Sequence, residues 1–386
     1  MATAKNPAEK GWLWILFFFL PALAYPGPLS SAWGFRIDLP VEYRYTGGDK
    51  RDSFAFQSPT GAALDLKIYP GSEYPSVNAL AEDIQRRLKN QGTAERFEYH
   101  KKQAVLLKLR FSAGPGGGSE GWGLCLELDR PIRSGDKGKP LLLALAYGPA
   151  AREDLQLLHI SALDSIAPTL ADRLTPGPIT ERLHPRGKGR YVPVAGLAAE
   201  ALVYEQDAEA AQYLVDREFE VLRRYEDSPL WKEAWSRFYR MIYRDSFDRL
   251  ANIAFALERH WNIPVLENRD FAGKVLEWVQ AFHYERDLLG SDFVNLVAAA
   301  TEGRGDCDSR AMLWAIVLEQ ANIPTAIMVS SQYSHAMGLA DLPGTGAHFN
   351  FGGKSWLVAE TTTKVPIGQI NVKTSNTAYW IGIAFE

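Results

Sequence analysis

Hydrophobic and polar residues alternate along the first part of the chain, from about residue 33 to residue 174. Leu64, Leu66 and Ile68 have the period of two that is typical of half-buried strands. Apolar residues at helical spacing predict a helix over 78–89, and a second helix, interrupted near Pro168, is predicted over 151–170. Further strand patterns lie at 97–111, 122–128 and 141–147. This order predicts helices packed on an antiparallel sheet.

The pattern changes after residue 174. Residues 175–191 are rich in proline and glycine, which predicts a linker between domains. Apolar residues then recur at helical spacing through 192–264, including a helical pattern over 198–225. Ser228 and Pro229 are a typical N-cap and first residue of a helix, followed by two apolar stripes that end at Trp261. We therefore expect a helical region between two domains.

The last part of the chain, 265–386, contains segments with helical spacing and segments with the strand period of two. A helix is predicted over 272–283, and an apolar helix follows a glycine turn at residues 305–311, GDCDSRA. Strand patterns then occur at 325–330 and 334–339, and a hairpin at 347–360 turns at two glycines. The fold class predicted for the whole chain is α+β.

Composition and net charge narrow the range of possible functions. The 386 residues are 46% hydrophobic and 23% charged, as in globular proteins, and a formal net charge of −4 argues against nucleic acid as a partner. The two cysteines are too few for a disulfide scaffold. Cys125 lies out of phase with its apolar neighbours on a predicted strand, so it is interpreted as a packed structural thiol. Cys307 is interpreted as the reactive thiol.

The first 24 residues have the features of an export signal. Lys5 and Lys10 precede an apolar run at 11–20, and Ala22 and Ala24 form a small-x-small cleavage pattern. We expect a mature protein in the periplasm or the medium; an uncleaved membrane anchor is the alternative. No other contact with a membrane is expected.

Cys307 is the main candidate for chemistry. It lies at the start of the apolar helix, where unpaired N–H groups and the helix dipole stabilise a thiolate, so a lowered pKa is expected. His335 and Glu360 follow it, in the order cysteine, histidine, acid. Asp306 and Asp308 oppose thiolate formation unless they cap the helix or point outward.

Three motifs in this part resemble those of transglutaminase-like cysteine hydrolases: residues 305–311, 334–336 (SHA) and 359–362 (AETT). The resemblance implies a nucleophile helix packed on an antiparallel sheet, with Cys307, His335 and Glu360 as a triad. Gln280, in a preceding segment that also resembles the family, would donate to the oxyanion or be a solvated helix residue. The family usually has aspartate where this chain has Glu360. His348 is a second candidate base, but the His-Ala motif favours His335.

The amino-terminal domain weakly resembles the PsbP-like α/β/α sandwich, on the patterns at 35–40 and 161–166. The glycine-rich segment 116–121 fits GxGxxG, but it opens a strand rather than a helix, so no dinucleotide is expected. HExxH, CxxC and paired histidines at metal spacing are missing from the helical region. Neither a cofactor nor a metal is therefore predicted.

Two functions follow from these residues. The first is an exported cysteine hydrolase or acyltransferase acting on amide bonds of proteins or peptides through a thioester, as a peptidase rather than a cross-linker. The second is a catalytically silent module of the same fold that binds or assembles with proteins of the cell envelope, with the amino-terminal domain contacting a partner.

Overall fold

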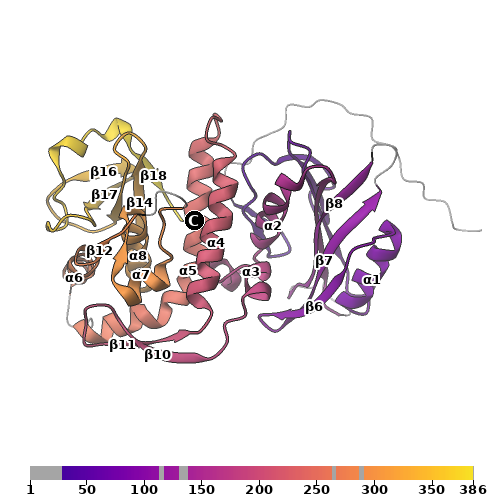
Figure 1. Ribbon diagram of the computed structural model, residues 1–386, viewed down its shortest axis with the longest axis horizontal. Helices are drawn as coiled ribbons and strands as arrows, with labels where there is room; N and C mark the ends of the chain where they lie inside the picture. The colour runs from indigo at the N-terminus through magenta and orange to yellow at the C-terminus, as the bar shows by residue number, and fades with distance from the viewer. Residues whose placement is uncertain (1–27, 113–116, 130–137, 263–266, 287–290, 386) are drawn as a thin grey trace, which may run out of the picture.

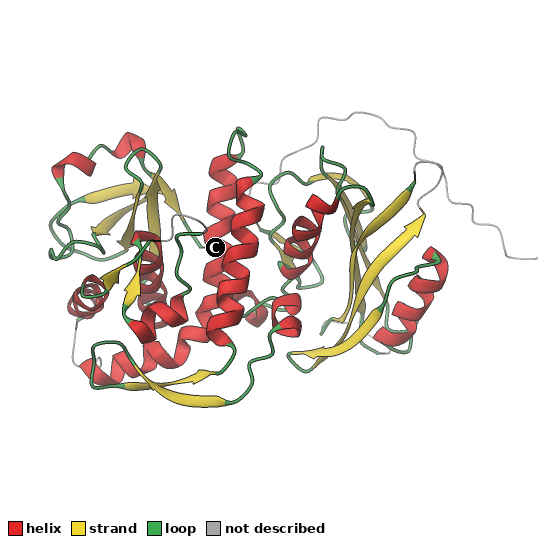
Figure 2. Ribbon diagram, viewed as in Figure 1, coloured by secondary structure: helices red, strands yellow, loops and turns green. Residues whose placement is uncertain are grey.

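The computed structural model describes residues 28–385 except 113–116, 130–137, 263–266 and 287–290. The export segment predicted at 1–24 lies outside the described residues. Across the described ranges, the structure contains no helix of the length and apolarity needed to span a membrane. Helices and antiparallel sheets are both present, which confirms the α+β class (Figure 2).

The amino-terminal domain is built on a seven-stranded antiparallel sheet with a helix on each face (Figure 1). Its strand order is β3-β4-β5-β9-β8-β7-β6. The strands are β3 (Arg44–Gly47), β4 (Ser53–Gln57), β5 (Ala63–Tyr69), β6 (Ala94–Tyr99), β7 (Lys102–Ser112), β8 (Gly118–Glu127) and β9 (Leu141–Pro149). Helix α1 (Val77–Leu88) covers one face and α2 (Gln156–Asp164) the other, as the pattern predicted. Strands β1 (Leu29–Ser30) and β2 (Arg36–Ile37) form a small separate pair.

Side chains of β8 alternate between the two faces of the sheet and so contribute to the hydrophobic core on each face. Leu124 and Leu126 pack in the core under α2, whereas Cys125 packs in the core under α1. Cys125 is fully buried and unpaired, which confirms the prediction of a structural thiol.

The carboxy-terminal body contains a five-stranded antiparallel sheet in the order β16-β17-β15-β14-β18. Its strands are β14 (Thr325–Ser330), β15 (His335–Ala340), β16 (His348–Phe351), β17 (Lys354–Ala359) and β18 (Ile381–Ile383). Helix α8 (Cys307–Gln320) packs on β14 and β15, next to α6 (Asn268–Gln280) and α7 (Leu296–Glu302). A glycine allows the close approach of helix and sheet, since a Cβ on Gly338 would lie 2.4 Å from the ring of Trp314.

The region between the two sheets differs from the prediction. Helix α3 (Pro178–Leu183) lies within the expected linker, and β10 (Gly189–Pro193) pairs with β11 (Glu200–Tyr204) in a hairpin. The helix predicted over 198–225 is therefore wrong in its first part, and only α4 (Asp207–Arg223) is helical. The cause is a period of two in β11, where Ala201 and Val203 are buried and their neighbours are not.

Helix α5 (Trp231–Trp261) joins the two apolar stripes into one helix of 31 residues. It stands between the two sheets in Figure 1 and begins three residues after the predicted N-cap, Ser228. Phe238 and Leu250 of α5 belong to the same hydrophobic core as α8, whereas Ala234 belongs to the core under α2. That shared core starts at Val194, so the predicted core at 265–386 includes only part of the packing unit.

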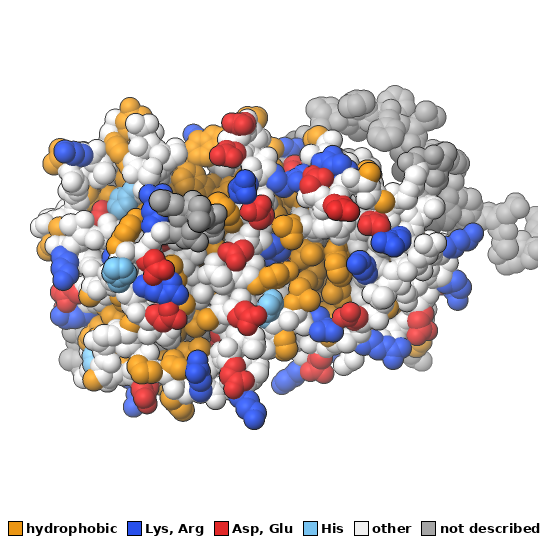
Figure 3. Space-filling view, in the orientation of Figure 1, with side chains coloured by type: hydrophobic (Ala, Val, Ile, Leu, Met, Phe, Trp, Pro, Cys, Tyr) orange, Lys and Arg blue, Asp and Glu red, His pale blue; other side chains and the backbone are white. Residues whose placement is uncertain are grey.

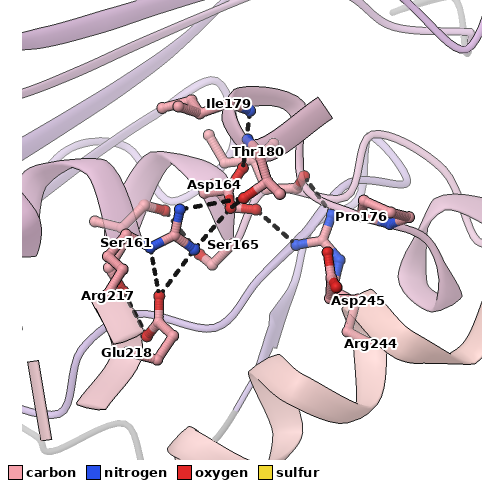
Figure 4. A network of polar contacts seen from close by, with 12 residues as sticks. Ser161, Asp164, Ser165, Pro176, Ile179, Thr180, Arg217, Glu218, Arg244 and Asp245 are labelled. Carbon is pink, nitrogen blue, oxygen red and sulfur yellow. Dashed lines mark hydrogen bonds and ion pairs between the residues drawn. The ribbon is translucent and has the colours of Figure 1, made fainter. Parts of the chain in front are cut away.

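Buried charges join the two parts across α2, α3, α4 and α5 (Figure 4). Asp164, at the end of α2, accepts the backbone N–H groups of Ile179 and Thr180 in α3. Arg217 of α4 donates to Asp164 Oδ2 at 2.7 Å and to Glu218 Oε1 at 3.0 Å. Arg237 of α5 donates to the other oxygen of Glu218 at 2.6 Å. Each carboxylate thus has several charged or polar donors, as buried ions require.

Candidate active site

Cys307 is the first residue of α8, as predicted. The preceding residue, Asp306, is the N-cap, with extended backbone, and its Oδ1 accepts the backbone N–H of Ser309 at 2.8 Å. The Ser309 hydroxyl donates to the same oxygen. One of the two flanking acids is therefore used to begin the helix.

The predicted base and acid are in contact. His335 is the first residue of β15, and Glu360 directly follows β17, the neighbouring strand. His335 Nε2 lies 2.9 Å from Glu360 Oε2, and Glu360 Oε1 accepts the backbone N–H and the hydroxyl of Thr362. Burial raises the pKa of Glu360, but the hydrogen bonds from His335 and Thr362 outweigh it and hold the pKa below its usual value. The longer side chain of glutamate thus reaches the imidazole.

The strand that carries His335 also contacts the thiol. The backbone N–H of Ala336 lies within hydrogen-bond reach of Cys307 Sγ, as does that of Asp308. Because Nε2 of His335 is paired with Glu360, any proton exchange between His335 and Cys307 would have to use Nδ1.

The thiol itself differs from the expectation of a thiolate. Burial, followed by the charges of Asp308 and Asp306, raises the pKa of Cys307 well above its usual value. The N–H groups of Ala336 and Asp308 lower it, but by less. The helix dipole is thus outweighed by desolvation and by two acids within one residue of the sulfur. The surroundings of Cys307 therefore favour its neutral thiol form.

Gln280 has a different place from the one expected of an oxyanion donor. Its Nε2 donates to the carbonyl oxygen of Glu360 at 2.8 Å and to that of Val365 at 2.9 Å. Both amide hydrogens are therefore engaged with the segment that follows β17. Gln280 thus fixes the position of the acid from the end of α6.

The structure separates the two candidate histidines. His348 lies on β16, the edge strand of the sheet, is exposed, and has its Nδ1 3.0 Å from the carbonyl oxygen of Gly346. His335 lies on the strand that packs against α8 and has a carboxylate partner. This placement favours His335, in agreement with the sequence motif.

Three aromatic side chains belong to the site in addition to the predicted residues. Tyr284 lies on β12 (His283–Tyr284), which pairs with β13 (Arg304–Gly305). Burial, followed by the charge of Cys307, raises the pKa of the Tyr284 phenol to about 12. Trp380 packs edge-on against His335, with ring centroids 6.1 Å apart. Tyr239 of α5 is fully buried and faces Asp308 and Cys307. Only Tyr284 had a signal in the sequence, since it lies in the segment that precedes the nucleophile.

Asp306, Cys307 and Asp308 also form the group of possible metal ligands found in the described part of the chain, with ligand atoms within 4.8 Å of one another. Asp306 is already the helix cap through two hydrogen bonds from Ser309. Two of the three residues thus already have other places in the site, Asp306 as the helix cap and Cys307 as the candidate nucleophile.

Comparisons with known proteins add no function. No family model matches the chain, and no curated protein matches it. A solved structure from Bacteroides thetaiotaomicron, described without a function, aligns with a TM-score of 0.26 at 9% identity, covering 86% of this chain and 89% of that one. The site therefore has to be interpreted from its own geometry.

Proposed function

We propose that this chain is an exported transglutaminase-like cysteine hydrolase that cleaves amide bonds of proteins or peptides. The observation that carries the proposal is the 2.9 Å contact between His335 Nε2 and Glu360 Oε2. This pair lies on a sheet against which α8 packs with Cys307 at its start, and the backbone N–H of Ala336, next to His335, is near enough to lower the pKa of the thiol. A nucleophile, a base and an orienting acid therefore come from three separate elements.

The reaction would begin with transfer of the Cys307 proton to Nδ1 of His335, while the sulfur attacks the carbonyl carbon of the substrate. Glu360 would accept the Nε2–H and stabilise the imidazolium. Backbone N–H groups of the first turn of α8 would stabilise the tetrahedral oxyanion. The imidazolium would then protonate the leaving amine, giving a thioester on Cys307. Water resolves this thioester in a peptidase, and a second amine resolves it in a cross-linking enzyme.

The surface is compatible with a protein substrate rather than a polyanion. Lys/Arg and Asp/Glu side chains are interspersed over the face shown in Figure 3. Exposed aromatic side chains lie near the reacting groups: Tyr284 is 47% exposed, and Tyr379 is 49% exposed beside Tyr333. Such rings provide apolar contact area for a peptide.

The test is hydrolysis of casein and of quenched fluorescent peptides by the purified protein. We expect Cys307→Ala, His335→Ala and Glu360→Gln each to lower the rate by about 10²-fold or more. His348→Ala is the matched control, because this histidine is exposed and away from the acid, and it should retain the wild-type rate. Equal rates for wild type and Cys307→Ala would refute the proposal.

The neutral thiol favours a second candidate, a catalytically silent module that binds or assembles with proteins of the cell envelope. The discriminating experiment is complementation: Cys307→Ala would replace the wild type fully in cells if the site is silent. If Cys307→Ala instead fails to replace the wild type in cells and also fails to hydrolyse peptides, this alternative is excluded.

A further inference from the structure

A cavity of about 40 Å³ lies where the amino-terminal domain meets α5. Its walls come from β2, from the end of α2, from the short 3₁₀ helix η2 (Ala171–Leu174), from α5 and from the segment that follows β18. None of its described lining residues belongs to the candidate active site. Since about 10–15 Å³ of such space holds one water, the cavity has room for a group about the size of a carboxylate or a phosphate.

The charges that line this cavity are mostly positive. Its described lining residues include one acid, Asp38, and four arginines: Arg36, Arg173, Arg240 and Arg244. Asp38 is already engaged, because its two oxygens accept from Nε and Nη2 of Arg240 at 2.7 and 3.0 Å. The guanidinium groups of Arg173 and Arg244 therefore have no other carboxylate among the described lining residues to balance them.

Arg244 is fixed in the wall of the cavity and is only 8% exposed. Its Nη1 donates to the carbonyl oxygen of Asp164 at 2.8 Å, and its Nη2 donates to that of Ile166 at 2.9 Å (Figure 4). Its Nε is buried and has no acceptor among the described residues. A buried charged donor is unfavourable without an acceptor, so this N–H calls for one.

Arg173, on η2, repeats this feature. Its Nε is also buried and has no acceptor in the part of the chain that the structure describes. The acids next to the two arginines in sequence are bound elsewhere: Asp172 lies 2.7 Å from Nδ1 of His100, and Asp245 accepts from Arg249 at 2.9 Å. Two guanidinium groups from different elements thus bring an unsatisfied donor to the same small cavity.

We propose that this cavity binds a small oxyanion from solution, of the size and charge of inorganic phosphate. The site is separate from the hydrolase function proposed above and does not depend on it. Guanidinium groups bind phosphate and carboxylate oxygens through N–H donors in a fixed planar arrangement. Here the Nε–H groups of Arg173 and Arg244 donate to oxygens of the anion. Because the walls come from the amino-terminal domain and from α5, the bound anion joins the two parts and stabilises the folded chain.

The experiment follows the thermal unfolding of the full chain at pH 7 as inorganic phosphate is added over the millimolar range. Sodium chloride keeps the ionic strength constant. We expect the Tm to rise and to saturate, whereas the weak stabilisation that phosphate gives any folded protein does not saturate. Arg173→Met removes one guanidinium, so the phosphate concentration at half of the rise should increase by about tenfold or more. Arg96→Met is the matched control, because the Arg96 side chain on β6 is 68% exposed, and it should behave as the wild type.

Two further variants keep the test decisive. Arg173→Lys serves if Arg173→Met does not fold, because it keeps the charge and loses the Nε donor, and its half-saturation should still rise several-fold. Glu386→Gln concerns the residue that follows Phe385 in sequence and distinguishes a free anion from a carboxylate of the chain itself. A saturable rise that occurs only in Glu386→Gln overturns the proposal. So does a wild type without a saturable rise, or a half-saturation that Arg173→Met and Arg173→Lys leave unchanged.

Discussion

Arg217 offers the sharpest test of how the two parts of the molecule are held together. The substitution is Arg217→Met, which keeps most of the buried apolar stem and removes the guanidinium. The side chains of Arg217 and Asp164 are 1% and 0% exposed, so loss of the cation leaves Asp164 and Glu218 as buried carboxylates with fewer donors. Removal of one partner of a buried pair costs about 3–5 kcal/mol.

The geometry sets the expectation at the lower end of that range. Asp164 retains donors from Ile179 and Thr180, and Glu218 retains Arg237 and the Ser161 hydroxyl at 2.9 Å. We therefore expect the free energy of unfolding to fall by about 3 kcal/mol. Because the network connects α2 and α3 with α4 and α5, the two parts should also begin to unfold separately.

The assay is urea unfolding followed by tryptophan fluorescence and by far-UV circular dichroism. The matched control is Arg223→Met, on the same helix but 59% exposed in its pair with Glu220, where a change within about 1 kcal/mol is expected. Adding Asp164→Asn to Arg217→Met should recover part of the loss, since Asp164 is the carboxylate left with neutral partners, the backbone N–H groups of Ile179 and Thr180. The reasoning is refuted if Arg217→Met costs no more than Arg223→Met, or if adding Asp164→Asn deepens the loss.

Three further predictions concern single side chains. Gln280→Leu removes two hydrogen bonds to carbonyl groups, so the free energy of unfolding in urea should fall by about 2 kcal/mol. If hydrolysis is lost while stability is unchanged, Gln280 is instead a direct catalytic donor. Glu360→Asp shortens the acid that holds His335, so kcat for peptide hydrolysis should fall with little change in KM; an unchanged kcat would contradict the orienting role. Burial lowers the pKa of His159 to about 4. As the pH drops, this histidine is therefore protonated in the unfolded chain at a higher pH than in the folded chain. The free energy of unfolding should fall by about 3 kcal/mol between pH 7 and pH 4. His159→Phe should flatten that pH dependence in urea titrations, and an unchanged slope would contradict it.

The fold was predictable where one pattern dominates a segment. Helix α1 and strand β14 have clear periods, and both lie within a residue of the predicted bounds. The hairpin of β10 and β11 was missed because its strands are short, and because the following helix α4 supplied most of the periodicity in the window. Buried arginines such as Arg217 and Arg237 are charged residues in a helical stripe, and the sequence cannot show that they face carboxylates on other helices, Asp164 of α2 and Glu218 of α4.

The candidate site, like the fold, was predictable from the sequence only in part. His335 and Glu360 follow local motifs, and the sheet register then brings them together. The raised pKa of Cys307 was not predictable, because it depends on burial and on the rotamers of the flanking acids. The sequence left open whether Asp306 and Asp308 cap the helix, and the structure assigns the cap to Asp306 alone of the pair. Tyr239 lies 68 residues before Cys307 in the chain, so only the packing of α5 against α8 reveals it.

Helix α5 has a consequence for how such a protein can evolve. It is about 46 Å long at 1.5 Å per residue, and Arg237 and Tyr239, two positions apart, serve different halves of the molecule. A recombination event that moved residues 265–386 alone into another gene would leave α8 without its buried neighbour and Asp308 without Tyr239. We expect such an exchange to yield an insoluble product, so that inheritance of the thiol chemistry requires the preceding seventy or so residues, from Val194 onward, as a single unit.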